Sequence, residues 1–340
     1  MKNTMIKTLS SCGLGWLTPW IRLVTGEEPK IQLKIIWSTM GIPLVAFGIF
    51  LMVWSFTASR INTSLGRLPG PLQVFAQAKG LVEEHKQDQK KKAEFYAGQK
   101  EKNAAKLKED PTAAVKIRKY TGKPTYLDQI ATSLLTVFTG FFIASAIAIP
   151  TGILCGISRT IMTALNPFIQ IFKPVSPLAW LPIVTMVVSA VYVTPNEMFP
   201  KAFITSAITV SLCCMWPSLI NTAHGVVSID KDYINVSRVL QLGVLTKIFK
   251  VVIPATLPYI FTGLRISLGV GWMVLIASEM LAQNPGLGKF VWDEFQNGSS
   301  DSLSRIMVAV FTIGIIGFIL DRVMVMLQKA VSFHREMISA

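Results

Sequence analysis

The chain has 340 residues, of which 51% are hydrophobic and 15% are charged, with a formal net charge of +14. Soluble domains carry about 25% charged residues, so this composition excludes an ordinary soluble domain and indicates a membrane protein. No recognisable nucleic-acid-binding module accompanies the positive charge, which basic loops beside an anionic membrane explain more simply. The four cysteines lack the spacing of metal ligands, and three lie in apolar runs, which is typical of buried thiols.

The amino-terminal third divides into three parts. Residues 1–34 are short, mixed and basic, and we expect them to lie at the cytoplasmic membrane interface, with no signal peptide. Residues 35–57 are predicted to be the first transmembrane helix, because about 20 apolar residues cross a bilayer core. Residues 58–125 are a charged insertion whose Lys- and Glu-rich part, 79–123, predicts a solvated helix. With a cytoplasmic amino terminus the insertion is extracytoplasmic, either as part of a surface that receives another protein or as a spacer.

The following stretch, residues 126–331, contains five further apolar runs. They bring the total to six transmembrane helices, so the predicted fold class is an all-α polytopic membrane protein with both termini on one side. Basic residues near the connecting loops place that side in the cytoplasm. The five runs extend over about residues 130–156, 178–193, 202–220, 257–281 and 306–327.

The apolar stretch from residue 161 to 193 is interrupted by four prolines. This pattern predicts a short helix on or re-entering the membrane, followed by the third span. Interrupted backbone is tolerated in a membrane only where it lines protein or a water-filled cavity. The interruption therefore indicates either a wall of the translocation pathway or ordinary helix packing. The candidate pathway residues here are Ser176, Pro177, Trp180 and Pro182.

A mostly polar segment, residues 222–256, separates the fourth and fifth spans. Within it, apolar residues recur at spacings of three to five, which predicts an amphipathic helix. A helix of this kind outside the bilayer lies on the membrane surface or docks into a partner, while an ordinary connecting loop is the plain alternative. The recurring residues are Val236, Val239, Leu240, Val244 and Phe249.

This segment resembles the cytoplasmic coupling loop of ABC-importer permeases. Asn235-Val236-Ser237 takes the place of the family's Glu-Ala-Ala, Gln241 falls at its usual Gly, and Pro254 ends the motif. Three further stretches, Ser176–Val184, Leu257–Met280 and Gly286–Trp292, follow in the order of the nitrate/sulfonate/bicarbonate (taurine) branch, closest to nitrate-transport permeases. The coupling-loop positions that the resemblance implies are Asp232, Asn235, Val236, Ser237, Val239, Leu240, Gln241, Gly243, Phe249 and Pro254.

The resemblance implies a type I ABC importer fold in the bacterial inner membrane. It implies a second copy of the permease, cytoplasmic ATPase subunits that bind ATP and Mg, and a periplasmic or lipid-anchored substrate-binding protein. The expected cargo is a small anion, nitrate or nitrite first, with bicarbonate, cyanate or an alkanesulfonate such as taurine as alternatives. An ion-coupled secondary transporter or channel is the rival class, although we find no convincing internal repeat.

The chain itself is not expected to be an enzyme. Gly286-Leu287-Gly288-Lys289 lacks the spacing of a phosphate-binding loop and follows a membrane span rather than a strand. No cofactor site, metal site or catalytic set is therefore predicted on this chain. ATP hydrolysis is expected on the separate ATPase subunits.

A few ionisable residues enter the apolar runs, and such residues usually have a function or a partner. Arg265 in the fifth span and Asp321 in the sixth lie at nearly equal depth, which predicts an ion pair that ties the two helices together. Glu279, near the outer end of the fifth span, is expected to face protein or water, in gating or packing. The pathway or gating candidates of this span are Gly269, Trp272 and Glu279.

Overall fold

The computed structural model describes residues 18–24, 28–63, 66–109, 117–193, 199–299 and 301–338 of the chain, the last seven without their side chains. Most of the predicted interfacial segment, residues 1–34, lies outside these residues. Its described parts are helix α2 (Thr18–Val24) and the beginning of α3 (Pro29–Ile36).

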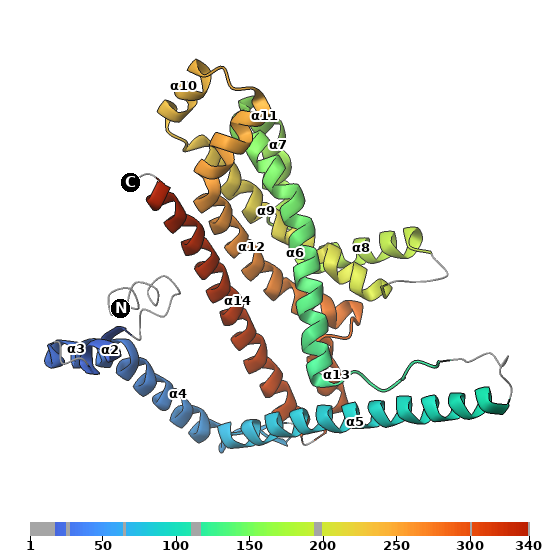
Figure 1. The fold of residues 1–340 in the computed structure, drawn as a ribbon. Helices are drawn as coiled ribbons and strands as arrows, with labels where there is room; N and C mark the ends of the chain where they lie inside the picture. The colour runs from blue at the N-terminus through green and yellow to red at the C-terminus, as the bar shows by residue number, and fades with distance from the viewer. Residues whose placement is uncertain are drawn as a thin grey trace.

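The described residues are almost entirely helical (Figure 1). A short antiparallel hairpin precedes the long helix α5. Its two strands, β1 (Asn62–Thr63) and β2 (Gly66–Arg67), have two residues each. The helices after α3 are η2 (Trp37–Gly41, a π-helical turn), α4 (Ile42–Ala58), α5 (Pro71–Glu109), α6 (Tyr126–Ile157), α7 (Arg159–Phe172), α8 (Pro177–Val191), α9 (Lys201–Val227), α10 (Lys231–Val239), α11 (Val244–Lys247), η3 (Ile248–Val252, also π-helical), α12 (Ile253–Ala282), α13 (Leu287–Asn297) and α14 (Ser302–Ile338).

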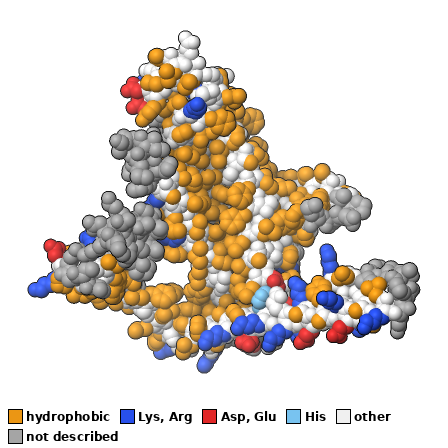
Figure 2. Space-filling view, in the orientation of Figure 1, with side chains coloured by type: hydrophobic (Ala, Val, Ile, Leu, Met, Phe, Trp, Pro, Cys, Tyr) orange, Lys and Arg blue, Asp and Glu red, His pale blue; other side chains and the backbone are white. Residues whose placement is uncertain are grey.

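Five helices of the described chain are long and apolar enough to cross a membrane, or up to six if a bent pair counts as one span. The bent pair is α7 with α8, whose axes meet at 101°. This bend lies where the prolines predict a short helix followed by the third span. The five long segments are Pro29–Ala58, Tyr126–Ile157, Lys201–Val227, Val244–Ala282 and Ser302–Val331. Their hydrophobic side chains cover the middle of the molecule between α10 at one end and α5 at the other (Figure 2).

Helices α6, α9 and α12 form the centre of the bundle and pack through small residues. A Cβ on Gly140 of α6 would lie 2.6 Å from the carbonyl oxygen of Ala207 in α9, and one on Gly152 would lie 2.7 Å from that of Leu219. Only glycine permits backbones to approach this closely, as is common between membrane helices. The most apolar part of the span Pro29–Ala58, in contrast, has no buried residue, although the ring of Trp54 in α4 packs against Phe311 of α14 with centroids 5.1 Å apart.

The structure divides the polar segment 222–256, in which an amphipathic helix was expected, among several helices. Helix α9 continues to Val227, because its last turn is buried against the beginning of α12; Thr222 and Thr256 are both fully buried. Helix α10 ends at Val239, and a new helix begins at Val244 and runs on into α12. The polar connection between the two long spans is therefore short, with α10 as its one full helix.

Candidate translocation and coupling sites

The structure brings Arg265 of α12 and Asp321 of α14 into contact in the middle of their helices. The Nε of Arg265 donates to Asp321 Oδ1 at 2.6 Å, and Nη2 donates to Oδ2 at 3.1 Å. This is the two-pronged geometry that makes Arg–carboxylate pairs strong and specific. The two side chains are nevertheless 42% and 39% exposed, so the pair lies on an open face of this chain.

Beside the ion pair lies a cavity of about 220 Å³ between α12 and α14. Two of the predicted pathway residues, Gly269 and Trp272, line it. Trp272 is held in place because its Nε1 donates to the carbonyl oxygen of Ile313 at 3.0 Å. A Cβ on Gly269 would meet nothing within 4 Å, so this glycine opens onto the cavity rather than onto a neighbouring helix. The cavity is lined by Arg265, Leu268, Gly269, Trp272, Gly317, Leu320 and Asp321.

Glu279 lies elsewhere, fully buried in a contact between α6, α12 and α13. Its carboxylate accepts hydrogen bonds from Ser133 Oγ at 2.8 and 2.9 Å and from the backbone N–H of Gly288 at 2.9 Å. Ser133 Oγ in turn accepts from the backbone N–H of Leu287 at 2.9 Å. The carboxylate thus faces protein, the first of the two surroundings expected for it, and holds the first turn of α13 in place.

The glycines at the beginning of α13 fit this contact closely. A Cβ on Gly286 would overlap the Glu279 carboxylate, and one on Gly288 would overlap the carbonyl of Ile276. The sequence analysis did not connect Glu279 with the Gly-Leu-Gly stretch. The signal in the sequence was a carboxylate in an apolar run followed shortly by two glycines, which often mark places where backbone approaches another group closely.

The four pathway candidates of the third span lie apart from this cluster and from the cavity, at the bend between α7 and α8. Ser176 caps α8, since its Oγ accepts from the N–H of Leu178 at 3.3 Å. Trp180 packs against Phe172 with ring centroids 5.7 Å apart, and Phe172 stacks on Trp216 of α9 at 6.4 Å. This aromatic stack fixes the bend against the bundle. Ser176 and Pro182 are exposed, and Pro177 and Trp180 are half-buried.

Helix α10 presents an exposed apolar surface at the end of the molecule opposite α5 (Figure 1). Asp230 caps the helix, because its Oδ1 accepts from the N–H of Asp232 at 3.0 Å. Ser237 is buried, whereas large apolar side chains on α10 and on the chain that follows it are exposed. We call this exposed set the α10 surface. Its members are Tyr233, Val236, Val239, Leu240, Val244, Leu245 and Phe249, with exposed fractions of 55% to 81%.

The turn after α10 contains a backbone conformation that normally favours glycine. Gln241 has a φ of 48°, in the left-handed region, whereas Gly243 has a φ of −59°. L-residues other than Gly, Asn and Asp adopt the left-handed region rarely, because the Cβ crowds the following carbonyl. Gln241, which the resemblance aligns with the motif's glycine, therefore adopts a backbone conformation that glycine adopts more readily, whereas Gly243 does not. Asn235 and Phe249 are exposed on this part of the chain, as is Pro254 at the beginning of α12.

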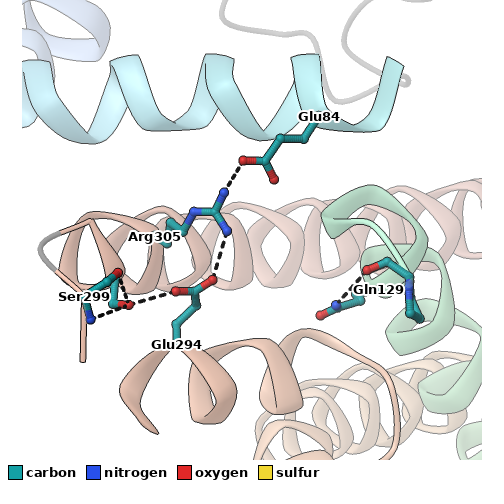
Figure 3. A network of polar contacts seen from close by, with 7 residues as sticks. Glu84, Gln129, Glu294, Ser299 and Arg305 are labelled. Carbon is teal, nitrogen blue, oxygen red and sulfur yellow. Dashed lines mark hydrogen bonds and ion pairs between the residues drawn. The ribbon is translucent and has the colours of Figure 1, made fainter. Parts of the chain in front are cut away.

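A second polar network joins α5 to the bundle at the opposite end (Figure 3). Arg305 of α14 donates through Nη1 to Glu294 of α13 at 3.0 Å, and its Nη2 is paired with Glu84 of α5. Glu294 also accepts from Ser302 Oγ at 3.0 Å. These contacts join residues up to 221 positions apart, so spacing in the sequence could not have indicated them.

The geometry is that of a helical membrane protein with an open charged cavity between two spans and an exposed apolar surface at one end. Comparison with known families agrees. Residues 148–333 match the model of the binding-protein-dependent transport system inner membrane component. The chain therefore belongs to this family, the permease subunits of ABC importers.

Individual relatives show which branch of these permeases the chain resembles. The nitrate import permease protein NrtB of Synechocystis sp. is 34% identical over 90% of this chain and 94% of its own length. The bicarbonate transport system permease protein CmpB of Synechococcus elongatus is 36% identical over 85% of this chain and 88% of its own length. A solved structure of the MetNI methionine ABC transporter in an inward-facing conformation matches 61% of this chain and 95% of its own with a TM-score of 0.51 at 16% identity. The relatives confirm the nitrate-transport branch of the permeases, and the structural match confirms the type I importer fold.

Proposed function

We propose that this permease carries a small inorganic oxyanion into the cell, nitrate or nitrite first, with energy from ATP hydrolysed on separate subunits. The similarity to nitrate permeases over nearly the whole chain supports this cargo. Bicarbonate is the second candidate, because a bicarbonate permease is similarly related over most of the chain. Both anions are small, planar and singly charged, so one pathway chemistry suits either of them.

The observation that carries the coupling part of the proposal is the α10 surface. Contiguous exposed apolar surface on a protein usually marks a contact with another protein or a membrane. The neighbouring charged residues Lys231, Asp232 and Arg238 on the same short helix favour a protein groove over the bilayer interior. We assign this surface to the ATPase subunits, so the α10 end of the molecule would face the cytoplasm. Six spans would bring both termini to that same side. The α5 end is then extracytoplasmic and available to a substrate-binding protein.

The exposed Arg265–Asp321 pair supports a pathway at the open face of α12 and α14. Charges in the middle of a membrane are costly when they face lipid, so such groups face water or protein. Nε and Nη2 of Arg265 donate to Asp321, and its other N–H groups have no partner among the described residues. A guanidinium that is balanced by a carboxylate attracts a passing anion without holding it firmly, which suits transport better than tight binding. A second copy of the chain facing this cavity would complete the pathway.

The test is ATP-dependent uptake into proteoliposomes. They would contain the chain with its ATPase subunits, the cognate binding protein and labelled nitrate, with bicarbonate and taurine as competitors. We expect nitrate uptake that requires ATP and the binding protein. Uptake of bicarbonate in preference to nitrate would contradict nitrate as the cargo but would still agree with an ABC importer permease. Transport by this chain alone, driven by an ion gradient, would contradict ATP coupling.

A further inference from the structure

The long helix α5 extends past the bundle, and a segment of chain returns along it (Figure 1). We call this return segment, residues 117–125, the strap. Gln99 of α5 bonds both backbone groups of Arg118: its Nε2 donates to the carbonyl oxygen and its Oε1 accepts from the N–H, each at 3.1 Å. The backbone N–H of Tyr120 donates to Tyr96 Oη at 3.2 Å. The strap is therefore attached to α5 through its own backbone.

Side chains fix the strap further. The hydroxyl of Tyr120 donates to Asp88 Oδ1 at 2.8 Å, and its ring packs edge-on against Phe95 at 5.5 Å. The hydrogen bond to Asp88 raises the pKa of Tyr120 above its ordinary value, so the hydroxyl remains a donor. At the end of the strap, Thr125 Oγ1 lies 2.5 Å from His85 Nδ1. The strap thus has a defined position between its two ends.

The strap lies on the side of α5 that faces the membrane-spanning helices (Figure 1). Val74 and Leu81, which are buried where α5 packs on the bundle, share a helical face with His85 and Gln99, which contact the strap. Thr125 is also the N-cap of α6, so the strap leads directly into a transmembrane span. Beyond the edge of the bundle, the strap therefore lies on the same side of α5 as the spans, and a membrane around those spans would face the strap.

The chemistry of the strap matches that surface. Its sequence, IRKYTGKPT, has three basic residues and no acidic one, whereas α5 mixes lysines with glutamates. Arg118 and Lys119 are exposed and form no ion pair with any described residue. Ile117 is 73% exposed and adds an apolar side chain beside them. A cluster of cations with an exposed aliphatic group is what anionic headgroups above a hydrocarbon layer attract.

We propose that the strap binds the headgroups of anionic phospholipids and so holds α5 against the membrane surface. This goes beyond the transport function and does not depend on the cargo. Each basic residue close to an anionic membrane strengthens binding by about fivefold. Arg118 and Lys119 together therefore favour the lipid-bound strap by roughly 30-fold. Lys123 adds to this, although it also borders a polar cavity of about 500 Å³ that it shares with Glu84 and Glu294.

Hydrogen–deuterium exchange of the full chain in nanodiscs tests the proposal. The discs would contain phosphatidylcholine alone or phosphatidylcholine mixed with phosphatidylglycerol. We expect anionic lipid to slow exchange in the peptide covering the strap by tenfold or more, and salt to reverse this, because screening weakens surface electrostatics. The double variant Arg118→Glu/Lys119→Glu should lose the response to phosphatidylglycerol. Arg118→Lys/Lys119→Arg should keep it.

The matched control reverses two charges on the other side of α5. Lys86 and Lys90 lie on an exposed face roughly opposite the residues that contact the strap, and Lys86→Glu/Lys90→Glu should leave the response unchanged. If the strap exchanges equally fast in both kinds of disc, the proposal is overturned. It is also overturned if the control pair abolishes the response, or if the strap is protected by added binding protein and not by anionic lipid.

Discussion

Glu279 shows how one side chain can place a whole helix. Its carboxylate is fully buried, and it bonds Ser133 of α6 and the N–H of Gly288 at the beginning of α13. Buried polar groups are stable only when they are hydrogen-bonded, and leaving one unpaired costs about 1–3 kcal/mol. Since Ser133 also binds Leu287, loss of the carboxylate would disturb three partners at once.

We predict that Glu279→Ala lowers the free energy of unfolding by about 3 kcal/mol, because a cavity and unpaired donors replace the carboxylate. Glu279→Gln should lose much less, since the amide keeps the size and can bond both Ser133 and Gly288. The measurement is thermal unfolding of the purified permease, with the amount of protein in the membrane as a second readout. Gly286→Ala should behave like Glu279→Ala, because its Cβ has no room beside the carboxylate.

The control acts on an acid of α13 that is largely exposed. Asp293 forms an i,i+4 pair with Lys289 and is 45% exposed, so Asp293→Ala should change stability by only about 0.5 kcal/mol. Equal losses in Asp293→Ala and Glu279→Ala would show that Glu279 does not hold α13. A transport defect in Glu279→Gln with normal stability would instead return this residue to the gating role that its position in the fifth span first suggested.

At the scale of elements, α10 and the turn after it form a small unit with exposed apolar side chains. Val239, the last residue of the nine-residue helix α10, is 81% exposed, and Leu240 directly after it is 64% exposed. A helix this short gains little stability by itself, because helix nucleation is unfavourable. Its attachment to the bundle is limited to buried residues such as Ser237. We infer that contact with the ATPase subunits orders α10 and the turn after it. Movement of the ATPase subunits would then be transmitted to the permease through this contact.

Val239→Asp should uncouple the transporter. Burial of an unpaired carboxylate in an apolar groove costs several kcal/mol, so docking should weaken by roughly a hundredfold or more. We expect ATP-dependent uptake to fall accordingly while the ATPase subunits still hydrolyse ATP and the permease remains in the membrane. The measurement is uptake and ATPase activity in the same proteoliposomes. Val239→Leu is the matched control, because it changes the same side chain but keeps it apolar, and it should transport normally. Normal uptake in Val239→Asp would refute this docking face.

The elements differ in how far the sequence alone could define them. The long spans follow from hydropathy, and the proline-rich stretch 161–193 correctly indicates a bend. Arg265 and Asp321 could be paired because equal depth brings them to one level and charges in a membrane seek partners. The boundaries around 222–256 could not be placed, because Thr222 and Thr256 look polar and yet are fully buried between α9 and α12. The strap, the contact of Glu279 with α13 and the Arg305 network all depend on contacts between distant residues, which a pattern within one segment does not contain.

At the scale of the whole molecule, a single chain leaves much of its membrane surface without a protein neighbour. The most apolar part of the span Pro29–Ala58 has no buried residue, and the cavity beside Arg265 opens to one side. Lipid suits the apolar surface of α4, but it does not suit a half-exposed ion pair. The arrangement is therefore consistent with a pathway between two copies of the chain, each contributing one cavity formed by α12 and α14.

Cross-linking through Gly269 tests this arrangement. An added side chain at Gly269 meets nothing within 4 Å, so Gly269→Cys should be tolerated and should point into the shared pathway. We expect bifunctional maleimides of increasing length to link two copies of Gly269→Cys, with one spacer length most efficient. Phe142→Cys, at a residue of α6 that is 64% exposed and outside the cavity, is the matched control, and the unmodified chain reports on the native cysteines. Because the two copies would move relative to each other during alternating access, ATP should change the preferred spacer length. If Gly269→Cys links no better than Phe142→Cys at any length, the cavity does not face a second copy and the ion pair must face another protein.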